Sequence, residues 1–342
     1  MPSEQPFSRI VEIFGAEELI DLAFRRASKV KVSFPRKATT LDKAKVRERA
    51  RATMVYQVVS SKLYQLLRSF PRLESLHPFY KELLELVSGI SNVRNALKGI
   101  ARTRRLVKEI YNQTLREIKS AKTPSDCTKL RKSFYGRAAS LLRDADTYFR
   151  LIETIRRELK DIPAINFDEV KVVIAGYPGV GKSTLVSLIS SAKPLIGKYP
   201  FTTKDVIVGH IRLNDEKIQV IDTPGLLEKP IKKMKKEELK ALSALKLLAD
   251  VVIFIVDVAE TSGFTIEQQW ALLDSLMKYI EKRDRIVVLN KIDLAREEQV
   301  ARAKSIFGEK CLQTSLTKGW GINELVDRLF SLCKSYTSYR NR

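Results

Sequence analysis

The sequence predicts an α plus α/β chain, in which a basic helical bundle precedes a mostly parallel sheet with helices on both faces. Three observations support this fold class. Apolar residues recur at three- and four-residue spacing from 17 to 159, as in helices packed on one another. From residue 170 onward, short β-branched runs alternate with helical segments, as in a parallel sheet covered on both faces. A length of 342 residues also suits two domains, each with its own core.

The boundary between the two domains is expected near residue 165. Pro163 ends the last helical pattern and opens a linker at 161–165, so we predict domains at 1–165 and 166–342. The first domain should hold about four long helices. Breaks between them are expected at Phe34-Pro35, Phe70-Pro71, Ser88-Gly89 and Thr123-Pro124-Ser125-Asp126. Strands of the second domain are expected at 170–175, 206–211, 217–221, 251–256 and 285–289.

Composition argues against several classes of protein. Hydrophobic residues make up 44% and charged residues 30%, and no apolar run approaches the roughly 18 to 20 residues of a membrane-spanning helix. The first residues lack the basic start and apolar core of a secretory signal, so we expect a cytoplasmic chain. The three cysteines, Cys127, Cys311 and Cys333, form no paired motif and are expected to be reduced, without a zinc site.

Positive charge is concentrated in the first domain. Residues 1–165 hold 34 Lys+Arg against 18 Asp+Glu, whereas residues 166–342 hold 28 against 22. Such a field favours polyanions, either nucleic acid or an anionic membrane surface, although the charges could also merely keep the bundle soluble. We favour RNA, with Phe34, Tyr56 and Tyr64 as aromatic candidates. The basic clusters are Lys29, Lys31, Arg36, Lys37, Lys43, Lys45, Arg47, Arg49 and Arg51, and Arg102, Arg104 and Arg105.

A phosphate-binding loop follows the first predicted strand. The segment 176–183 reads Gly-Tyr-Pro-Gly-Val-Gly-Lys-Ser, which matches GxxxxGK[ST] and leads into a helix. Its N–H groups and the helix start can surround phosphates, Lys182 can reach the β- and γ-phosphates, and the Ser183 hydroxyl can ligate Mg²⁺. The residues expected to bind nucleotide here are Gly176, Tyr177, Pro178, Gly179, Val180, Gly181, Lys182, Ser183 and Thr184.

Two further elements complete the phosphate side. Asp222-Thr223-Pro224-Gly225 supplies a DxxG element, in which Asp222 should hold Mg²⁺ through water and the Gly225 N–H should meet the γ-phosphate. The segment 199–203 is placed to be a switch whose threonine closes on Mg²⁺. Thr202 and Thr203 compete for this role, and we favour Thr203. The expected metal ligands are Ser183, Thr203 and Asp222, and the expected catalytic groups are Lys182, Thr203 and Gly225.

Guanine is selected by Asn290-Lys291-Ile292-Asp293, which matches NKxD after a predicted strand. The Asp293 carboxylate can accept from N1–H and N2–H of guanine, a donor pair that adenine lacks, and Lys291 can pack along the base. Thr314-Ser315-Leu316 takes the place of the loop whose backbone N–H contacts guanine O6. The base-side binding residues are therefore Asn290, Lys291, Asp293, Ser315 and Leu316. We predict a P-loop GTPase domain that cycles between GTP and GDP with Mg²⁺.

Hydrolysis is expected to be slow. Leu226 stands where Ras-like GTPases place a water-orienting glutamine, so the intrinsic rate should be on the order of 10⁻⁴ to 10⁻² s⁻¹ unless a partner stimulates it. Gly179 stands where K⁺-dependent GTPases usually have asparagine, which argues against K⁺ activation.

The sequence resembles the Obg-related GTPases and, within them, the Nog-type nucleolar GTP-binding proteins. The resemblance covers roughly residues 5 to 335. It is carried by the switch Tyr-Pro-Phe-Thr-Thr-Lys at 199–204, by Val208-Gly209-His210, by Asp-Thr-Pro-Gly-Leu at 222–226, and by the segment 70–80 in the helical half. It implies a large-subunit ribosome assembly factor that binds pre-ribosomal RNA and proteins, is monomeric off the ribosome, and has the short archaeal-type form.

Two other classes compete with this interpretation. A membrane-surface or signalling GTPase would use the basic domain on anionic lipid, but it should carry an amphipathic face or a lipidation site, and neither is evident, so no membrane contact is expected. A tRNA-modifying GTPase would bring its own catalytic domain, and no cysteine or carboxylate constellation indicates one. His77, between Leu76 and Pro78, is interpreted as a capping or packing residue.

Overall fold

The computed structural model describes residues 5–34, 36–191, 194–198, 205–213, 216–222, 227–229, 231–280 and 284–340. These residues form two compact units. The helical unit consists of Arg9–Ser75 and Ser88–Lys160. The sheet unit contains the described parts of Met1–Ser8, Leu76–Val87 and Asp161–Arg342.

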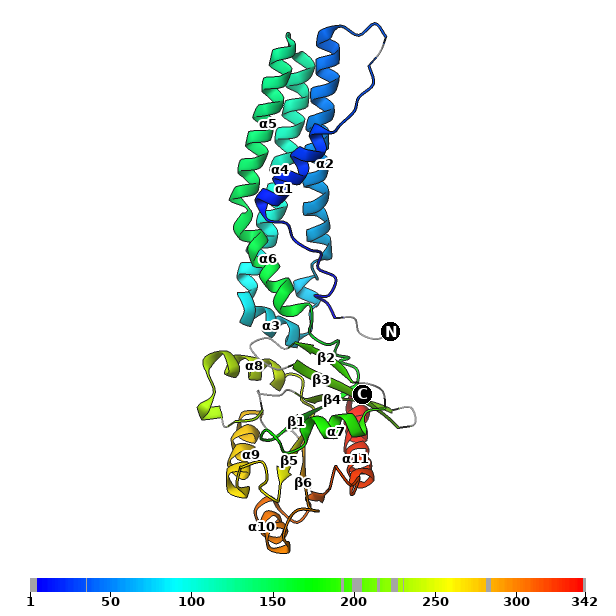
Figure 1. Ribbon diagram of the computed structural model, residues 1–342, viewed down its shortest axis with the longest axis vertical. Coiled ribbons are helices and arrows are strands. Elements are labelled where there is room, and N and C mark those ends of the chain that lie inside the picture. The colour runs from blue at the N-terminus through cyan, green and yellow to red at the C-terminus, as the bar shows by residue number, and fades with distance from the viewer. Residues whose placement is uncertain are drawn as a thin grey trace. The chain divides into compact units, whose positions relative to one another are not determined.

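The helical unit is built on three long helices that lie side by side (Figure 1). These are α2 (Thr40–Ser69), α4 (Ile90–Ser120) and α5 (Pro124–Asp144), and the shorter α1 (Ala16–Ser28) and α6 (Asp146–Leu159) pack on them. A 3-10 turn, η1 (Leu73–Ser75), follows α2. The breaks expected at 70–71, 88–89 and 123–126 coincide with helix ends.

Side-chain caps explain where two of the long helices begin. The Thr39 hydroxyl accepts a hydrogen bond from the Asp42 N–H at 3.2 Å, and the Thr123 hydroxyl accepts one from the Asp126 N–H at 3.1 Å. In both cases the aspartate carboxylate accepts in return from the threonine N–H, which satisfies helix-start donors reciprocally. The apolar stripes meet in a buried core that includes Val55, Leu63, Ile100, Phe134 and Phe149.

A seven-stranded mixed sheet forms the centre of the sheet unit, in the order β2-β3-β4-β1-β5-β6-β7. The strands are β1 (Val170–Ala175), β2 (Leu195–Lys198), β3 (Asp205–Leu213), β4 (Glu216–Asp222), β5 (Val251–Asp257), β6 (Asp284–Asn290) and β7 (Leu312–Gln313). The pairs β2–β3 and β3–β4 are antiparallel and the other pairs are parallel. The predicted fold class is confirmed.

Helices cover both faces of this sheet. The helices after the first strand are α7 (Lys182–Ile189), α8 (Lys236–Lys246), α9 (Ile266–Ile280), α10 (Glu297–Phe307) and α11 (Ile322–Arg340), with a 3-10 turn η2 (Ile231–Lys233) before α8. Figure 1 shows α8 and α9 on one side of the sheet and α7 and α11 on the other. Every residue of β1 and β5 is buried, as their β-branched sequences predict. The carboxyl ends of these two strands share one edge, where ligands of such sheets bind.

Helix α3 (Pro78–Ser88) packs with the sheet unit, although its sequence lies between helices of the bundle. The His77 ring stacks on Phe167 with centroids 3.5 Å apart, and Glu82 accepts a hydrogen bond from the Ser243 hydroxyl of α8 at 2.7 Å. His77 Nδ1 also accepts from the Phe79 N–H at 3.2 Å, so this histidine caps and packs as expected. The domain predicted at 1–165 therefore differs from the compact helical unit by the segments 5–8, 76–87 and 161–165.

Candidate nucleotide-binding site

The phosphate-binding loop joins β1 to α7 and depends on two glycines. Gly176 has φ +142°, and a Cβ there would lie 2.6 Å from the Ile255 carbonyl oxygen. Gly181 has φ +110°, and a Cβ there would lie 2.7 Å from Asn290 Nδ2. Side chains at either position would be strained and would collide with β5 or with Asn290 at the end of β6. The loop therefore leads directly into the start of α7, where the N–H groups favour anions.

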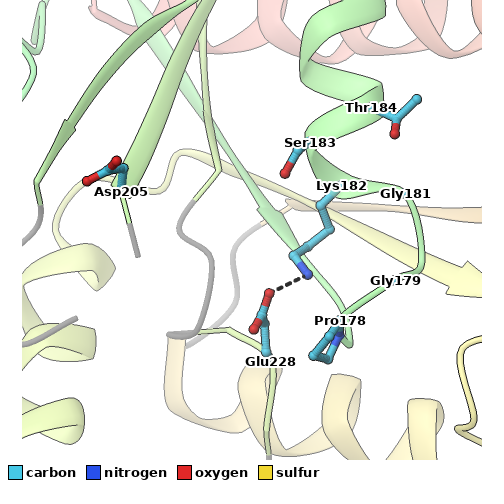
Figure 2. A pocket seen from close by; sticks show the side chains of 8 residues that line it. All are labelled: Pro178, Gly179, Gly181, Lys182, Ser183, Thr184, Asp205 and Glu228. Carbon is cyan, nitrogen blue, oxygen red and sulfur yellow. Dashed lines mark ion pairs between the residues drawn. The ribbon is translucent and has the colours of Figure 1, made fainter. Parts of the chain in front are cut away.

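A cavity of about 460 Å³ opens over this loop (Figure 2). Its lining residues are Pro178, Gly179, Gly181, Lys182, Ser183, Thr184, Asp205 and Glu228. Six of these eight belong to the segment that the sequence predicted to bind phosphates. Lys182 is buried at the base of this loop, where its Nζ donates to the carbonyl oxygens of Gly176 at 3.0 Å and Tyr177 at 2.9 Å.

The predicted Mg²⁺ ligands Ser183 and Asp222 lie together. The Ser183 hydroxyl donates to Asp222 Oδ2 at 2.7 Å, and the aspartate is fully buried at the end of β4. A hydroxyl beside a carboxylate at the edge of a phosphate cavity is an oxygen donor set of the kind that Mg²⁺ prefers. These residues therefore fit the metal. Thr203 and Gly225, together with Thr202 and Leu226, lie outside the described residues.

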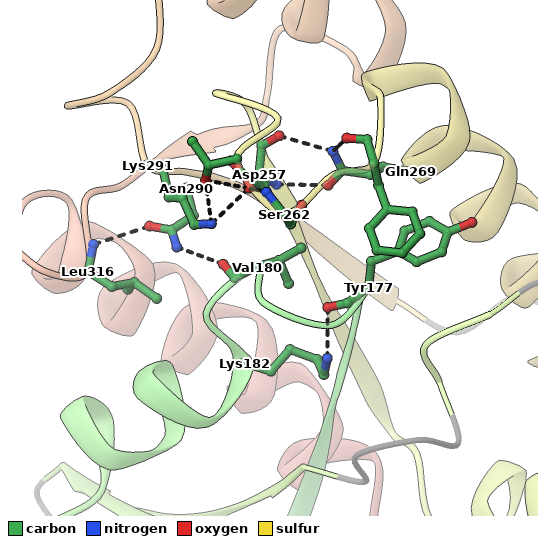
Figure 3. A network of polar contacts seen from close by, with 11 residues as sticks. Tyr177, Val180, Lys182, Asp257, Ser262, Gln269, Asn290, Lys291 and Leu316 are labelled. Carbon is green, nitrogen blue, oxygen red and sulfur yellow. Dashed lines mark hydrogen bonds and ion pairs between the residues drawn. The ribbon is translucent and has the colours of Figure 1, made fainter.

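Asn290 connects the phosphate side to the base side (Figure 3). Its Nδ2 donates to the Val180 carbonyl at 2.8 Å, and its Oδ1 accepts from the Thr314 hydroxyl at 3.2 Å and from the Leu316 N–H at 3.1 Å. The side chain is 3% exposed. Its amide thus holds the phosphate-binding loop, β6 and the loop after β7 in one arrangement.

Lys291 is held by an acid that the sequence analysis missed. Its Nζ donates to Asp257 Oδ2 and to the Thr261 hydroxyl, both at 2.8 Å, and its φ is +63°, a strained backbone conformation (Figure 3). Asp257 is fully buried at the end of β5 and also accepts from the Ser262 N–H at 2.7 Å. Burial opposes ionisation, but hydrogen bonds from Lys291 and Ser262 outweigh it and lower the pKa of Asp257.

The remaining base-side residues differ in what they can offer a ligand. Asp293 Oδ1 is buried and has no hydrogen-bond partner among the described residues, so it presents an acceptor, as guanine recognition requires. The Ser315 N–H donates to the Trp320 carbonyl at 3.2 Å, and the Leu316 N–H donates to Asn290. Both amides therefore have protein acceptors in this structure, and their contact with guanine O6 stays a prediction.

Aromatic stacking stiffens the phosphate-binding loop. The ring of Tyr177 lies on that of Phe264, with centroids 3.8 Å apart and planes 15° apart. Phe264 belongs to the loop after β5 that also contains Thr261 and Ser262. Burial raises the pKa of Tyr177, in keeping with a ring that packs. The loop that holds Lys291 thus also contacts the phosphate-binding loop.

Comparison with known proteins identifies the family to which the chain belongs. Residues 7–166 match the model of the NOG1 N-terminal helical domain, and residues 171–291 match that of the 50S ribosome-binding GTPase. An uncharacterised protein of Methanocaldococcus jannaschii is 38% identical over 86% of this chain and 83% of its own length. Nucleolar GTP-binding protein 1 of Caenorhabditis elegans is 28% identical over 96% of this chain and 49% of its own length. The chain belongs to the nucleolar GTP-binding protein 1 family.

The family assignment confirms the resemblance found in the sequence, and it makes the chain a GTP-binding protein with a P-loop GTPase domain. The chain spans 37% to 49% of the length of the relatives that carry the name nucleolar GTP-binding protein 1. A crystal structure under that name from Plasmodium falciparum is 27% identical, covers 52% of this chain and 93% of its own, and has a TM-score of 0.45.

Sequence reasoning missed Asp257 and Glu228 because neither belongs to a motif of the nucleotide site. Asp257 could have been found as the one polar residue that ends the buried run 251–257 at the carboxyl edge of the sheet. Glu228 lies near the DxxG element, and its contact with Lys182 at 2.9 Å bridges 46 positions of the chain. No local spacing signals a contact of this kind.

Proposed function

We propose that this chain is a nucleotide-switched assembly factor for the large ribosomal subunit, acting in the cytoplasm with GTP, GDP and Mg²⁺. The observation that carries the proposal is the combination, in one chain, of a guanine-nucleotide site with a strongly basic helical unit of the family's own type. The match of residues 171–291 to the 50S ribosome-binding GTPase model and the nucleolar relatives support a ribosomal partner.

Exposed basic side chains of the helical unit are the proposed contacts with ribosomal RNA. Arg47 and Arg51 form ion pairs with the buried Glu48, at 3.1 Å and 3.6 Å, so part of the first basic cluster stabilises the bundle. The basic side chains of this cluster that are exposed are Lys29, Lys31, Arg36, Lys37, Lys43, Arg47 and Arg49. Lys and Arg on an open surface attract phosphate backbones through counterion release.

The three aromatic candidates for base stacking differ in how much of each ring is open to a ligand. Tyr56 stacks on Tyr111 with centroids 4.2 Å apart, so one of its faces is covered. Phe34 is 39% exposed and Tyr64 is 47% exposed, and Arg104 lies over the Tyr64 ring at 5.0 Å from its centroid. Because they are more exposed than Tyr56, Phe34 and Tyr64 are the better platforms for unpaired bases, although Arg104 lies over one face of Tyr64.

The test is co-sedimentation of the protein with large ribosomal subunits at several salt concentrations, with a GTP analogue, GDP or no nucleotide. We expect association that depends on nucleotide and weakens steeply as salt rises. Replacing Lys29, Lys31, Arg36 and Lys37 by Gln should weaken association, whereas the same change at Lys278, Arg302, Lys310 and Arg328 of the sheet unit serves as the charge-matched control. Equal losses in the two variants would contradict the proposed RNA surface.

Binding to liposomes of anionic lipid is measured in the same experiment, because it tests the alternative of a membrane-surface GTPase. None of the helices among the described residues is long and apolar enough to cross a membrane. Strong liposome binding without nucleotide-dependent association with subunits would favour a membrane-surface GTPase and would overturn the assembly-factor proposal.

Slow hydrolysis that a partner stimulates is part of the proposal. It rests on Leu226 in the sequence, a position outside the described residues, and on Gly179, which supplies no side chain for K⁺. Phosphate release should be on the order of 10⁻⁴ to 10⁻² s⁻¹ for the protein alone and should rise when large subunits are added. Equal rates in Na⁺ and K⁺ are expected, and a large K⁺ stimulation would contradict the argument from Gly179.

A further inference from the structure

Glu228 is one of two acidic residues that line the phosphate cavity, the other being Asp205. Glu228 Oε1 lies 2.9 Å from Lys182 Nζ, and the two side chains are 9% and 5% exposed (Figure 2). An ion pair this well buried is electrostatically stronger than one on the surface. Glu228 therefore forms an ion pair with the lysine that is expected to contact the β- and γ-phosphates.

The contacts of Lys182 account for its full donor capacity. An ammonium group has three N–H donors, and here they meet the carbonyl oxygens of Gly176 and Tyr177 and the carboxylate of Glu228. The two carbonyls belong to the phosphate-binding loop itself, whereas Glu228 comes from the segment after β4. A phosphate oxygen that binds this ammonium group must replace one acceptor, and Glu228 is the one of these three acceptors that does not belong to the phosphate-binding loop.

The segment around Glu228 also contacts the loop through its backbone. The Gly176 N–H donates to the Leu227 carbonyl at 3.2 Å. On the other side, Lys229 forms an ion pair with Glu238 of α8 at 2.8 Å. Glu228 therefore lies between the phosphate-binding loop and α8, six positions after Asp222 on the side expected to face the terminal phosphate.

We propose that Glu228 is a specificity-determining residue that tunes the preference between GTP and GDP. Its carboxylate competes with the terminal phosphate for Lys182, and the two anions repel each other beside an ammonium group that is largely buried. GTP, which adds the phosphate nearest this segment, must displace Glu228 further than GDP does. The inference rests on the nucleotide switch of the proposed function, and not on its ribosomal partner.

The test compares Glu228→Gln with Asp205→Asn. Gln keeps the size and a hydrogen-bond acceptor but removes the charge, whereas Asp205 lines the same cavity on β3 and points away from Lys182 (Figure 2). Affinities for a non-hydrolysable GTP analogue and for GDP are measured with fluorescent nucleotides in Mg²⁺. Glu228→Gln should raise the ratio of GTP-analogue to GDP affinity by about tenfold or more, and Asp205→Asn should change both affinities by a similar factor.

Two outcomes would overturn the proposal. An unchanged ratio in Glu228→Gln, or an equal rise in Asp205→Asn, would show that Glu228 does not discriminate between the nucleotides. An unchanged ratio with an equal loss of both affinities would make Glu228 a structural support for Lys182. Glu228→Asp keeps the charge on a shorter side chain and should remain nearer the wild-type ratio. Failure to bind ribosomal subunits would leave this ratio unaffected, so the two proposals fail separately.

Discussion

The buried acid Asp257 offers the sharpest test of how the base side is held together, through the substitution Asp257→Asn. A single carboxylate oxygen, Oδ2, accepts from Lys291 at 2.8 Å, from the Thr261 hydroxyl at 3.0 Å and from the Ser262 N–H at 2.7 Å. Because all three donors meet the same oxygen, an asparagine can place its own Oδ1 there. The substitution therefore removes the charge while leaving the shape and the acceptor in place.

The expected cost is about 2 kcal/mol of unfolding free energy. A hydrogen bond to a charged group contributes about 1.5 to 3 kcal/mol and a neutral one about 0.5 to 1.5 kcal/mol, so each of the three bonds weakens by about 1 kcal/mol. Burying a neutral amide in place of a carboxylate recovers part of this loss. The Lys291 side chain is 22% exposed, so water can solvate its ammonium in part. GTP affinity should fall by about tenfold, since the neutral amide oxygen holds the Lys291 ammonium less firmly than the carboxylate does.

Acid should reduce the difference in unfolding free energy between the wild-type protein and Asp257→Asn. The pKa of Asp257 is lowered in the folded state, so its ionisation stabilises the fold above the ordinary aspartate pKa of about 4. This stabilisation is lost as pH falls through the folded-state pKa. Urea unfolding at pH 7.5 should therefore show the full difference between wild type and Asp257→Asn, and the difference should shrink progressively below about pH 4.

A matched control is available on the surface of α9. Asp274 forms an ion pair with Lys278 at 2.6 Å, but the two side chains are 45% and 76% exposed, so Asp274→Asn should cost no more than about 0.5 kcal/mol. If Asp257→Asn destabilised the protein no more than Asp274→Asn, or if its effect were independent of pH, the argument from burial and charge would be refuted.

Three other substitutions test separate parts of the structure. Asp293→Asn should move preference from guanosine towards xanthosine nucleotides by about tenfold or more in competition binding, and unchanged GTP affinity would contradict its role at the base. Gly181→Ala should lower nucleotide affinity by at least about tenfold, because its Cβ would lie 2.7 Å from Asn290 Nδ2. Gly263→Ala is its control: φ is +83° but the space around the Cβ is open, so the variant should lose only about 1 to 2 kcal/mol of unfolding free energy through backbone strain. Ser243→Ala removes a hydrogen bond of 2.7 Å to Glu82, so amide hydrogen exchange in α3 should quicken, by about fivefold for a loss of about 1 kcal/mol. Unchanged exchange there would argue against α8 as a support for α3.

The motifs of the nucleotide site could be read from the sequence because each consists of residues close together in the chain. The loop at 176–183 and the aspartate after β6 have local spacings, and the buried strands β1 and β5 show as β-branched runs. The short edge strand β2 was not predicted, because Leu195 and Ile196 are exposed and the strand holds only four residues around a glycine. Its identity depends on pairing with β3, which no local pattern reveals.

The supporting contacts of the site could not be predicted for a different reason. Asp257 and Lys291 are 34 positions apart, and Glu228 and Lys182 are 46 apart, so each pair meets only after the sheet has formed. Buried charges need partners, but the sequence does not say which partner the fold will supply. Tertiary structure therefore decides which acids support the site and which are solvated.

Helix α3 shows how a segment can belong to one domain in sequence and to another in space. Its apolar spacing is that of the bundle, and the helical-domain family model at 7–166 includes it. Yet His77 stacks on Phe167 in the linker before β1, Tyr80 is buried enough to raise its pKa to about 12, and Glu82 contacts α8. Both ends of the segment Leu76–Val87 continue into the helical unit. Contacts with α8 therefore help to position α3. The ion pair between Lys229 and Glu238 joins α8 in turn to the segment whose Glu228 contacts Lys182. The backbone on either side of α3 leads to α2 and to α4.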